Sequence, residues 1–293
     1  MAKKSPLTTD VRARIPTIVA RGQRLAPHED LYHWVLTRTW PQFFGVVTLG
    51  FIALNCLFAT IYTAAPGCIA NATGFADHFF FSVQTLGTIG YGSMAPATRY
   101  GNVVVSIEAL VGLLTTALVT GLTFVRFARP TARILFCDKV VVGPRDGVPH
   151  LMFRLANWRR NQVVETQLSV MLLVDEKTRE GDMMRRPMPL ELVRNKNAMF
   201  ALTWTAMHRI DENSPFFGKD AMERLRAQRA EIFVSVSGLD ETIMQQISAR
   251  FRYQLDDIVQ NARFADVLSM QEDGTRVIDY DRFHDIVRLE ENT

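Results

Sequence analysis

The sequence has little cysteine, because only Cys56, Cys68 and Cys137 occur among its 293 residues. The three are scattered, and no spacing typical of a metal site or a disulfide framework is present. A Gly-rich phosphate loop, a nucleophile motif, an internal repeat and a low-complexity stretch are also absent from the sequence. The net charge of +3 is too small to indicate a partner. We therefore expect no enzyme activity, no cofactor and no nucleic-acid partner.

Two long segments have almost no charge. The segment 40–63 has none, and the segment 101–125 has only Glu108 among a few small polar residues. About 20 apolar residues are enough to span a bilayer core. Both segments are apolar on nearly every face, which does not fit an amphipathic helix of a soluble protein. We predict an outer membrane helix over 40–63 and an inner membrane helix over 100–127.

A shorter apolar segment lies between these helices and cannot cross a membrane. Residues 75–86 are predicted to form a re-entrant pore helix, which is tolerated at membrane depth only where protein surrounds it. This segment leads directly into the pentapeptide Thr88-Ile89-Gly90-Tyr91-Gly92. The order of helix, half-helix, glycine-containing loop and helix is that of a minimal channel pore.

The pentapeptide resembles the TVGYG loop from which potassium channels build a selectivity filter, four copies lining one pore. The carbonyl oxygens of such a filter replace the water around a K⁺ ion, and Gly90 and Gly92 reach the required backbone angles without steric penalty. Ile89 takes the place of valine, and the Thr88 side chain supplies a further oxygen. By itself the pentapeptide also fits an ordinary turn, but its position between two membrane helices favours a filter. Because one loop cannot enclose an ion, we expect a homotetramer with K⁺ as the permeant ion.

Positive charges flank the membrane helices on their outer sides. They are Lys3, Lys4, Arg12, Arg14, Arg21, Arg24 and Arg38 before the first helix and Arg126, Arg129 and Arg133 after the second. The connecting segment has only Arg99, so both termini are predicted to be cytoplasmic. We expect an integral protein of the plasma (inner) membrane. No signal peptide is expected, because the first apolar run begins about 40 residues into the chain and is too long for a cleaved segment.

The hydrophobic pattern changes to period two from Lys139 onward. Apolar and polar residues alternate in the segments 150–155, 167–174, 200–205 and 232–236. Asp273-Gly274 between two apolar runs is a strong hairpin signal. Several short strands predict a β-sandwich over 130–293, and about 160 residues are enough for a separate core. One helical insert is expected over 219–230.

Further motifs extend the resemblance along the chain. Segment 79–85 is similar to the pore helix of the inward-rectifier potassium channels, bacterial group, and segment 126–130 to the basic exit of their inner helix. Segments 145–147, 151–154 and 157–159 are similar to the first cytoplasmic strands of that family. Segment 208–215 resembles its His-x-Ile-Asp-x-x-Ser-Pro segment, and segment 279–284 resembles one of its late strands. The resemblance implies a membrane α plus all-β fold, with an immunoglobulin-like cytoplasmic β-sandwich that extends the pore of a tetramer.

The resemblance also implies roles for residues near the inner membrane face. Segment 30–39 corresponds to an interfacial slide helix, and a plain N-terminal extension of the first span is the alternative. Phe124 corresponds to a gate at the bundle crossing, where bulky apolar residues close the pore by dewetting, although such a Phe also fits contact with lipid. Thr116 takes the inner-cavity position that carries an acid in strong rectifiers. A neutral residue there predicts weak block by Mg²⁺ or polyamines.

Several basic residues are candidates for contact with anionic lipid. Arg126 and Arg129 are expected at the level of the inner headgroups, where each charge contributes about 1 kcal/mol of attraction. They either mark topology alone or, by the resemblance, bind phosphoinositides or other anionic lipids. Arg159 and Arg160 could complete that surface, and Trp40 is a suitable anchor at headgroup level.

Acidic residues form the last group of candidates. Glu165 and Glu241 correspond to acids that ring the cytoplasmic pore and attract cations, with solvated surface acids as the alternative. Glu108 lies within a membrane helix, which makes it a functional candidate. Gln84 stands where many relatives place the Glu of a filter-stabilising pair. We expect Glu108 to pack behind the filter and to hydrogen-bond toward the pore helix instead.

The sequence favours a passive K⁺ channel that is gated by its cytoplasmic domain, independently of voltage. Three other functions fit it less well. A membrane-anchored sensor with a vestigial pore would leave the intact filter unexplained. An enzyme in the cytoplasmic half lacks a catalytic constellation, because His208 and Asp211 have no nucleophile beside them in the sequence and more simply order a loop. A cation channel of poor selectivity is distinguished by comparing K⁺ and Na⁺ flux.

Overall fold

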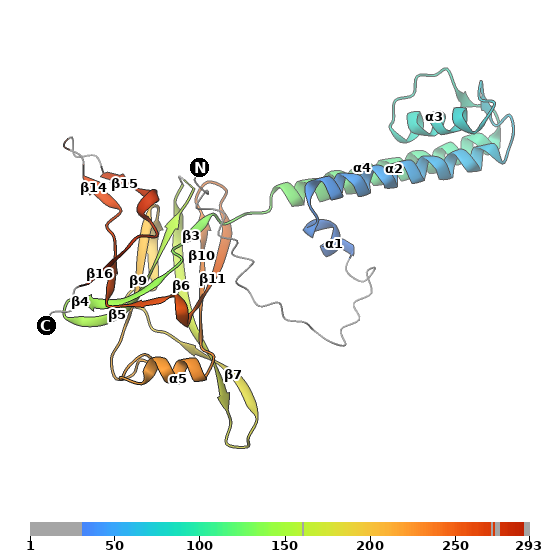
Figure 1. Cartoon of the computed structure of the whole chain (residues 1–293). Coiled ribbons are helices and arrows are strands. Elements are labelled where there is room, and N and C mark those ends of the chain that lie inside the picture. Colours follow the sequence, from blue (N-terminus) through green and yellow to red (C-terminus); the bar gives the residue numbers. More distant parts are fainter. Residues whose placement is uncertain (1–30, 160, 271, 273–275, 290–293) are drawn as a thin grey trace, which may run out of the picture. The chain divides into compact units, whose positions relative to one another are not determined.

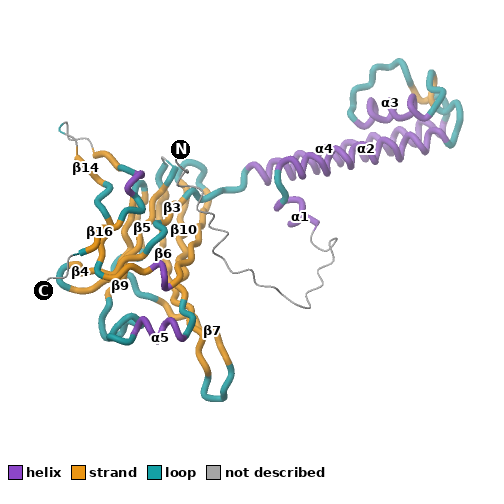
Figure 2. The backbone as a smooth tube through the Cα atoms, viewed as in Figure 1, coloured by secondary structure: helices purple, strands orange, loops and turns teal. Residues whose placement is uncertain are grey.

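The computed structural model describes residues 31–159, 161–270, 272 and 276–289 (Figure 1). Arg160, Asp273 and Gly274 therefore lie outside the described residues. The chain forms two compact units that divide between Arg129 and Pro130, where the predicted β-sandwich begins. We call them the helical unit and the β-domain, after the elements that dominate each (Figure 2).

The described part of the helical unit contains four helices. They are α1 (Leu31–Thr37), α2 (Trp40–Thr63), α3 (Phe75–Leu86) and α4 (Arg99–Phe127). The bounds of α2 and α3 are those expected from the sequence, and α4 begins one residue earlier than expected. α1 is separate from α2: Thr39 has an extended conformation, its N–H donates to Gln42 Oε1 at 3.1 Å, and Pro41 follows in the first turn of α2. Segment 30–39 is thus not a plain extension of the first span.

α2 and α4 are long and apolar enough to cross a membrane, and most of their surface is exposed in the single chain. A helix in the core of a soluble protein would be buried, so this exposed apolar surface fits contact with lipid or with other copies of the chain. α3 packs against both helices through a cluster formed by Phe58 and Tyr62 of α2, Phe81 and Leu86 of α3, and Val104 of α4.

Two five-stranded sheets form the β-domain. The first has the strand order β11-β10-β6-β7, with β8 also paired to β6, and the second has the order β12-β4-β5-β3, with β9 also paired to β5. The strands are β3 (Ile134–Phe136), β4 (Val140–Arg145), β5 (Val148–Asn157), β6 (Val163–Lys177), β7 (Met183–Pro189), β8 (Lys196–Phe200), β9 (Thr203–Arg209), β10 (Glu231–Asp240), β11 (Gln245–Gln254) and β12 (Ile258–Gln260). All these pairings are antiparallel except β12 with β4.

Shorter elements complete the described chain. β1 (Ile69–Ala70) pairs with β2 (Ala95–Pro96) in the helical unit. In the β-domain, β13 (Ala262–Phe264) pairs with β16 (Ile286–Arg288), and β14 (Leu268–Met270) pairs with β15 (Arg276–Ile278) across the predicted hairpin. The helix α5 (Ala221–Ala227) is shorter than the expected helical insert over 219–230.

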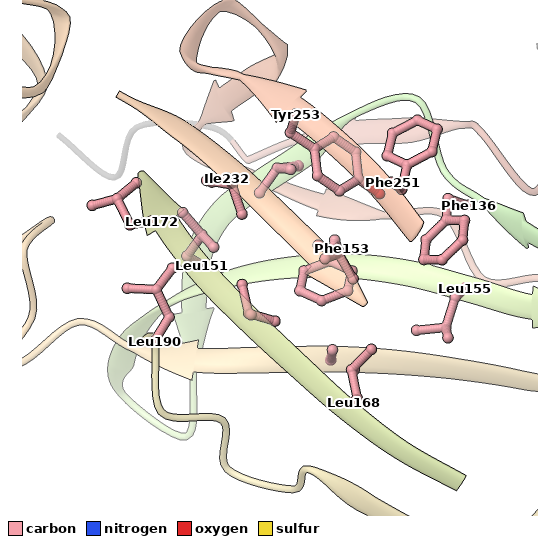
Figure 3. Packing of buried hydrophobic residues seen from close by; sticks show 14 of the residues in the cluster. Phe136, Leu151, Phe153, Leu155, Leu168, Leu172, Leu190, Ile232, Phe251 and Tyr253 are labelled. Atoms are coloured by element: carbon pink, nitrogen blue, oxygen red, sulfur yellow. The ribbon is translucent and has the colours of Figure 1, made fainter. Parts of the chain in front are cut away.

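One hydrophobic core lies between the two large sheets (Figure 3). Leu151, Phe153 and Leu155 of β5 contribute from one sheet, and residues such as Leu168 of β6 and Ile232 of β10 contribute from the other. The alternating side chains of β5 and β10 that were expected from period two therefore do fill a common interior. The predicted β-sandwich is confirmed.

The strand predicted over 200–205 is wrong in one respect. β8 ends at Phe200 and pairs with β6, whereas β9 begins at Thr203 and pairs with β5 in the other sheet. The chain crosses between the sheets at residues 201–202. The alternating pattern persists across the crossing because the rings of Phe200 and Trp204 both enter the core, with centroids 6.0 Å apart.

Candidate functional site

Left-handed backbone at alternate residues distinguishes the loop after α3. Thr88, Gly90 and Gly92 have φ angles of +56°, +59° and +82°, whereas Ile89 and Tyr91 between them do not have positive φ. Successive carbonyls of a regular strand point to opposite sides, and reversing φ at every second residue allows them to face one side. Thr88 is β-branched, so its positive φ costs about 1–3 kcal/mol. Strain of this kind gathers at functional sites.

The last turn of α3 holds the start of this loop. The backbone N–H groups of Ile89 and Gly90 donate to the carbonyl of Gln84 at 2.8 and 3.3 Å. The N–H of Thr88 donates to the carbonyl of Thr85 at 3.0 Å. Gln84 thus supports the loop through its main chain, a role that its side-chain type did not indicate.

The segments on either side of α3 and the loop are tied together. Asn71 Nδ2 donates to the carbonyl of Ser93 at 2.8 Å, and the N–H of Ala97 donates to the carbonyl of Cys68 at 2.8 Å. A Cβ at Gly101 would lie 2.4 Å from the same Cys68 oxygen, so α4 can start this close only with glycine. These contacts fix both ends of the loop within the helical unit.

A buried polar cluster lies behind the loop and centres on Glu108. The carboxylate of this residue is fully buried, and its oxygens contact Ser82 Oγ of α3 and Tyr62 Oη of α2, the latter at 2.5 Å. Ser82 Oγ also lies 2.9 Å from Asn55 Oδ1 of α2. Glu108 therefore links all three helices, and its contact with Ser82 is a hydrogen bond toward the predicted pore helix. Asn55 and Ser82 were missed, although polar residues within apolar membrane segments are a recognisable signal.

Close packing of α4 against α3 depends on Gly112. A Cβ at this position would lie 2.9 Å from the carbonyl oxygen of Leu86, which is a main-chain atom that cannot move aside. A Cβ at Gly121 would meet nothing within 4 Å in the single chain. Gly112 therefore permits the close approach of the two helices.

Comparisons with known proteins account for both units. The family model described as "Inward rectifier potassium channel C-terminal domain" matches residues 134–293. The model described as "Ion channel" matches residues 44–129. The protein named "Inward rectifier potassium channel Kirbac3.1" from Paramagnetospirillum magnetotacticum is 40% identical over 262 residues, which cover 89% of this chain and 88% of that protein. The chain belongs to the inward rectifier potassium channel family.

Animal members of the inward rectifier family are similar to this chain over part of their length. "G protein-activated inward rectifier potassium channel 1" from Bos taurus is 30% identical over 74% of this chain, and "G protein-activated inward rectifier potassium channel 3" from Mus musculus is 31% identical over 76%. The chain spans only 45% and 58% of these two proteins. The family consists of ion channels and not of enzymes, in agreement with the sequence analysis.

Arg126 makes contacts within the chain that the sequence did not indicate. Its Nη1 donates to the carbonyl of Val35 at 2.8 Å, and its Nη2 donates to the carbonyl of Arg38. The guanidinium also lies over the rings of Trp40 and Phe43, at 4.7 and 5.0 Å from their centroids. Arg126 thus joins the end of α4 to the segment between α1 and α2, and Trp40 is one of its partners.

The other candidates for lipid contact differ in how far their charge is neutralised. Arg129 is exposed. Arg159 lies in the β-domain, where its Nη1 is 3.3 Å from the buried carboxylate of Asp240 and its Nη2 donates to Thr131 Oγ1 at 2.9 Å. Arg160 lies outside the described residues.

Thr116 and Phe124 are both exposed on α4 in the single chain, Phe124 to 72%. Glu165 and Glu241 are exposed in the β-domain. Glu165 has a φ of +50° beside an irregularity in the pairing of β6 with β10, and the N–H of Glu241 donates to the carbonyl of Gln162 at 3.1 Å. The two acids therefore lie toward the same end of the β6–β10 pair.

His208 connects neighbouring loops through both of its ring nitrogens. Its Nδ1 is 2.7 Å from the carbonyl oxygen of Glu191, and its Nε2 is 2.8 Å from Ser214 Oγ. Because the carbonyl only accepts, Nδ1 carries the proton and the Ser214 hydroxyl can donate to Nε2. Asp211 accepts from the N–H of Asn213 at 3.1 Å. Both residues order the loop, as expected.

Proposed function

We propose that the chain forms a potassium-selective channel of the inward-rectifier type, with four copies around one pore in the plasma (inner) membrane. The observation that carries this proposal is the left-handed backbone at Thr88, Gly90 and Gly92, within a filter-like pentapeptide between two membrane helices. Four such loops around an axis would supply the rings of carbonyl oxygens that coordinate dehydrated K⁺. The exposed apolar surface of α2 and α4 supports assembly in a bilayer.

A flux assay tests this proposal. Purified protein in liposomes should take up Rb⁺, Ba²⁺ should block the uptake, and Na⁺ should be carried far less than K⁺. Gly90→Ala should abolish selective flux, because a Cβ is strained at φ +59°. Gly50→Ala in α2 is the control, since its Cβ would meet nothing within 4 Å. Uptake no greater than in empty liposomes, or a monomeric protein in the bilayer, would rule the proposal out.

The charge distribution supports a location of both termini and the β-domain in the cytoplasm. On this orientation Phe124 lies toward the inner end of α4, where four copies could close the pore by dewetting. Phe124→Ala should then increase flux. Phe127→Ala is the matched control, because Phe127 is similarly exposed, at 82%, three residues further along. Equal effects of the two substitutions would argue against a gate at Phe124.

Anionic lipid is proposed to act mainly through Arg129. This residue is exposed, whereas Arg126 already donates to two carbonyls and Arg159 is paired with Asp240. Flux in phosphatidylcholine liposomes should change when phosphatidylglycerol is added, and Arg129→Gln should reduce that change. Arg133→Gln, which removes another exposed positive charge nearby in the sequence, is the control. An unaltered lipid response in Arg129→Gln would remove Arg129 from the proposed contact.

The remaining candidate residues concern block of the pore by cytoplasmic cations and the attraction of K⁺ to the cytoplasmic entrance. Thr116 is neutral, so we propose weak block by Mg²⁺ or polyamines from the inner cavity. Thr116→Asp should strengthen that block. Glu165 and Glu241, four copies of each, would attract cations to the entrance. Substituting both with Gln should lower flux most at low ionic strength, where screening is weakest.

A further inference from the structure

A small cavity in the β-domain is rich in arginine. It has a volume of about 150 Å³ and lies on the face of the β4–β5–β9 sheet opposite the main core. Among the residues that line it are Arg145 of β4, Arg154 of β5, Thr205 of β9 and Arg263 of β13. Neither the pore nor the candidates for lipid contact include any of these residues.

Arg154 is buried without a carboxylate partner among the described residues. It is only 6% exposed, and its guanidinium carbon lies 4.7 Å from the ring centroid of Phe264. Its Nη2 donates to the carbonyl of Ala265 at 2.7 Å, but its Nη1 is buried and has no hydrogen-bond partner within the described part of the chain. Burying an incompletely paired charge is costly, so Nη1 is a donor that lacks its acceptor.

Neighbouring elements bring more donors to the same cavity. A Cβ at Gly143 would lie 2.4 Å from the carbonyl oxygen of Ala262, so glycine is required for β13 to pack this closely on β4. This approach positions Arg263 near Arg145, and both side chains are exposed. Thr205 lies opposite Arg154 in the pairing of β9 with β5 and adds a hydroxyl.

Nearby carboxylates do not form ion pairs with these arginines in the described part of the chain. Asp266 acts electrostatically on Arg154, but its Oδ1 accepts from the N–H of Leu268 at 2.9 Å. No ion pair of Arg145, Arg154 or Arg263 with a carboxylate occurs in the ranges that the structure describes. Three guanidinium groups and one hydroxyl therefore line the space, and Asp266 offsets their positive charge only in part.

We propose that this cavity binds one small oxyanion, a phosphate, sulfate or carboxylate group, in contact with Arg154, Arg145 and Arg263. The planar fork of arginine matches such groups through paired N–H donors. Pockets for nucleotides and other drug-sized ligands have volumes of about 300–1,000 Å³, so this cavity is too small for them. We assign the oxyanion to the surrounding solution, since the described residues that line the cavity include no carboxylate.

The test uses the full chain in detergent and inorganic phosphate as the ligand. Isothermal titration at constant ionic strength should give saturable binding, and Arg263→Gln should weaken it about tenfold, the effect of losing one charge-assisted hydrogen bond. Arg179→Gln, which removes an exposed arginine from the turn after β6, should leave the affinity unchanged. Thermal unfolding of both variants shows whether each is folded.

The proposal is overturned if the wild type does not bind phosphate, or if Arg263→Gln binds it as tightly as Arg179→Gln. Potassium flux is measured separately and does not enter this comparison.

Discussion

At the scale of single residues, Glu108 gives the most direct prediction. Its carboxylate is the common partner of Tyr62 and Ser82 in a fully buried position. Glu108→Ala would leave the Tyr62 hydroxyl without its acceptor, whereas Ser82 Oγ would keep Asn55 Oδ1. A buried unsatisfied group costs about 1–3 kcal/mol. We expect a clearly lower midpoint for thermal dissociation of the tetramer. Thr116→Ala, at an exposed position of the same helix, is the control, and an Ala variant at 108 as stable as the control would contradict the assigned role.

Cys137 gives a prediction about pH. Its thiol is fully buried in the β-domain, and burial raises its pKa from 9.0 to about 11. Because the folded pKa exceeds the unfolded value, the buried thiol stabilises the fold below pH 9, and this contribution is lost as the pH rises from about 9 to 11. The loss is about 3 kcal/mol at most. Thermal midpoints of the wild type should therefore fall more steeply over this range than those of Cys137→Ala; parallel pH profiles would show that the thiol does not contribute.

At the scale of elements, the contact of α4 with α3 rests on one glycine. Gly112→Ala would place a Cβ 2.9 Å from the main-chain oxygen of Leu86, at the end of the helix that leads into the filter. Overpacking of this kind costs about 1–3 kcal/mol, so we expect reduced thermal stability together with altered Rb⁺ flux. Gly121→Ala has free space and gains helix propensity of up to about 1 kcal/mol, so it should be neutral or stabilising. Similar losses of stability in both variants would mean that contacts with other subunits, and not the Leu86 carbonyl, determine the effect.

The elements also show what the sequence could reveal. α2 and α4 were predictable because nearly uncharged runs of this length have few alternatives to crossing a membrane. β7 was missed because its sequence MMRRPMP contains two prolines and two arginines, and all its residues are exposed, so no alternating pattern marks it. β11 was missed because polar residues dominate QQISARFRYQ and only Ile247, Phe251 and Tyr253 of this strand belong to the core.

The candidate site was predictable to a similar degree. The loop with left-handed backbone at Thr88, Gly90 and Gly92 could be located because glycine permits such angles, and Glu108 because a carboxylate in an apolar helix is conspicuous. The role of Arg126 could not be read from the sequence, since a basic residue at a membrane edge fits lipid contact, topology or an internal hydrogen bond equally well. Only the positions of the Val35 and Arg38 carbonyls distinguish these uses.

At the scale of the whole molecule, each unit has its own hydrophobic cluster. The buried residues of the two β-domain clusters begin at Leu135, and those of the cluster in the helical unit end at Val104. The boundary at Arg129 and Pro130 also falls between the two regions matched by the family models. The stability of the β-domain should therefore depend little on the membrane helices.

This independence predicts the behaviour of a fragment that covers residues 130–293. Expressed alone, it should be soluble, give a circular dichroism spectrum dominated by β-structure and unfold in one cooperative thermal transition. Phe153→Ala should lower its midpoint strongly, because truncating a fully buried Phe costs about 3–5 kcal/mol. Phe217→Ala, at a side chain that is 49% exposed, should change the midpoint little. A fragment that aggregates without a cooperative transition would show that the β-domain needs the helical unit or its own tetrameric contacts to fold.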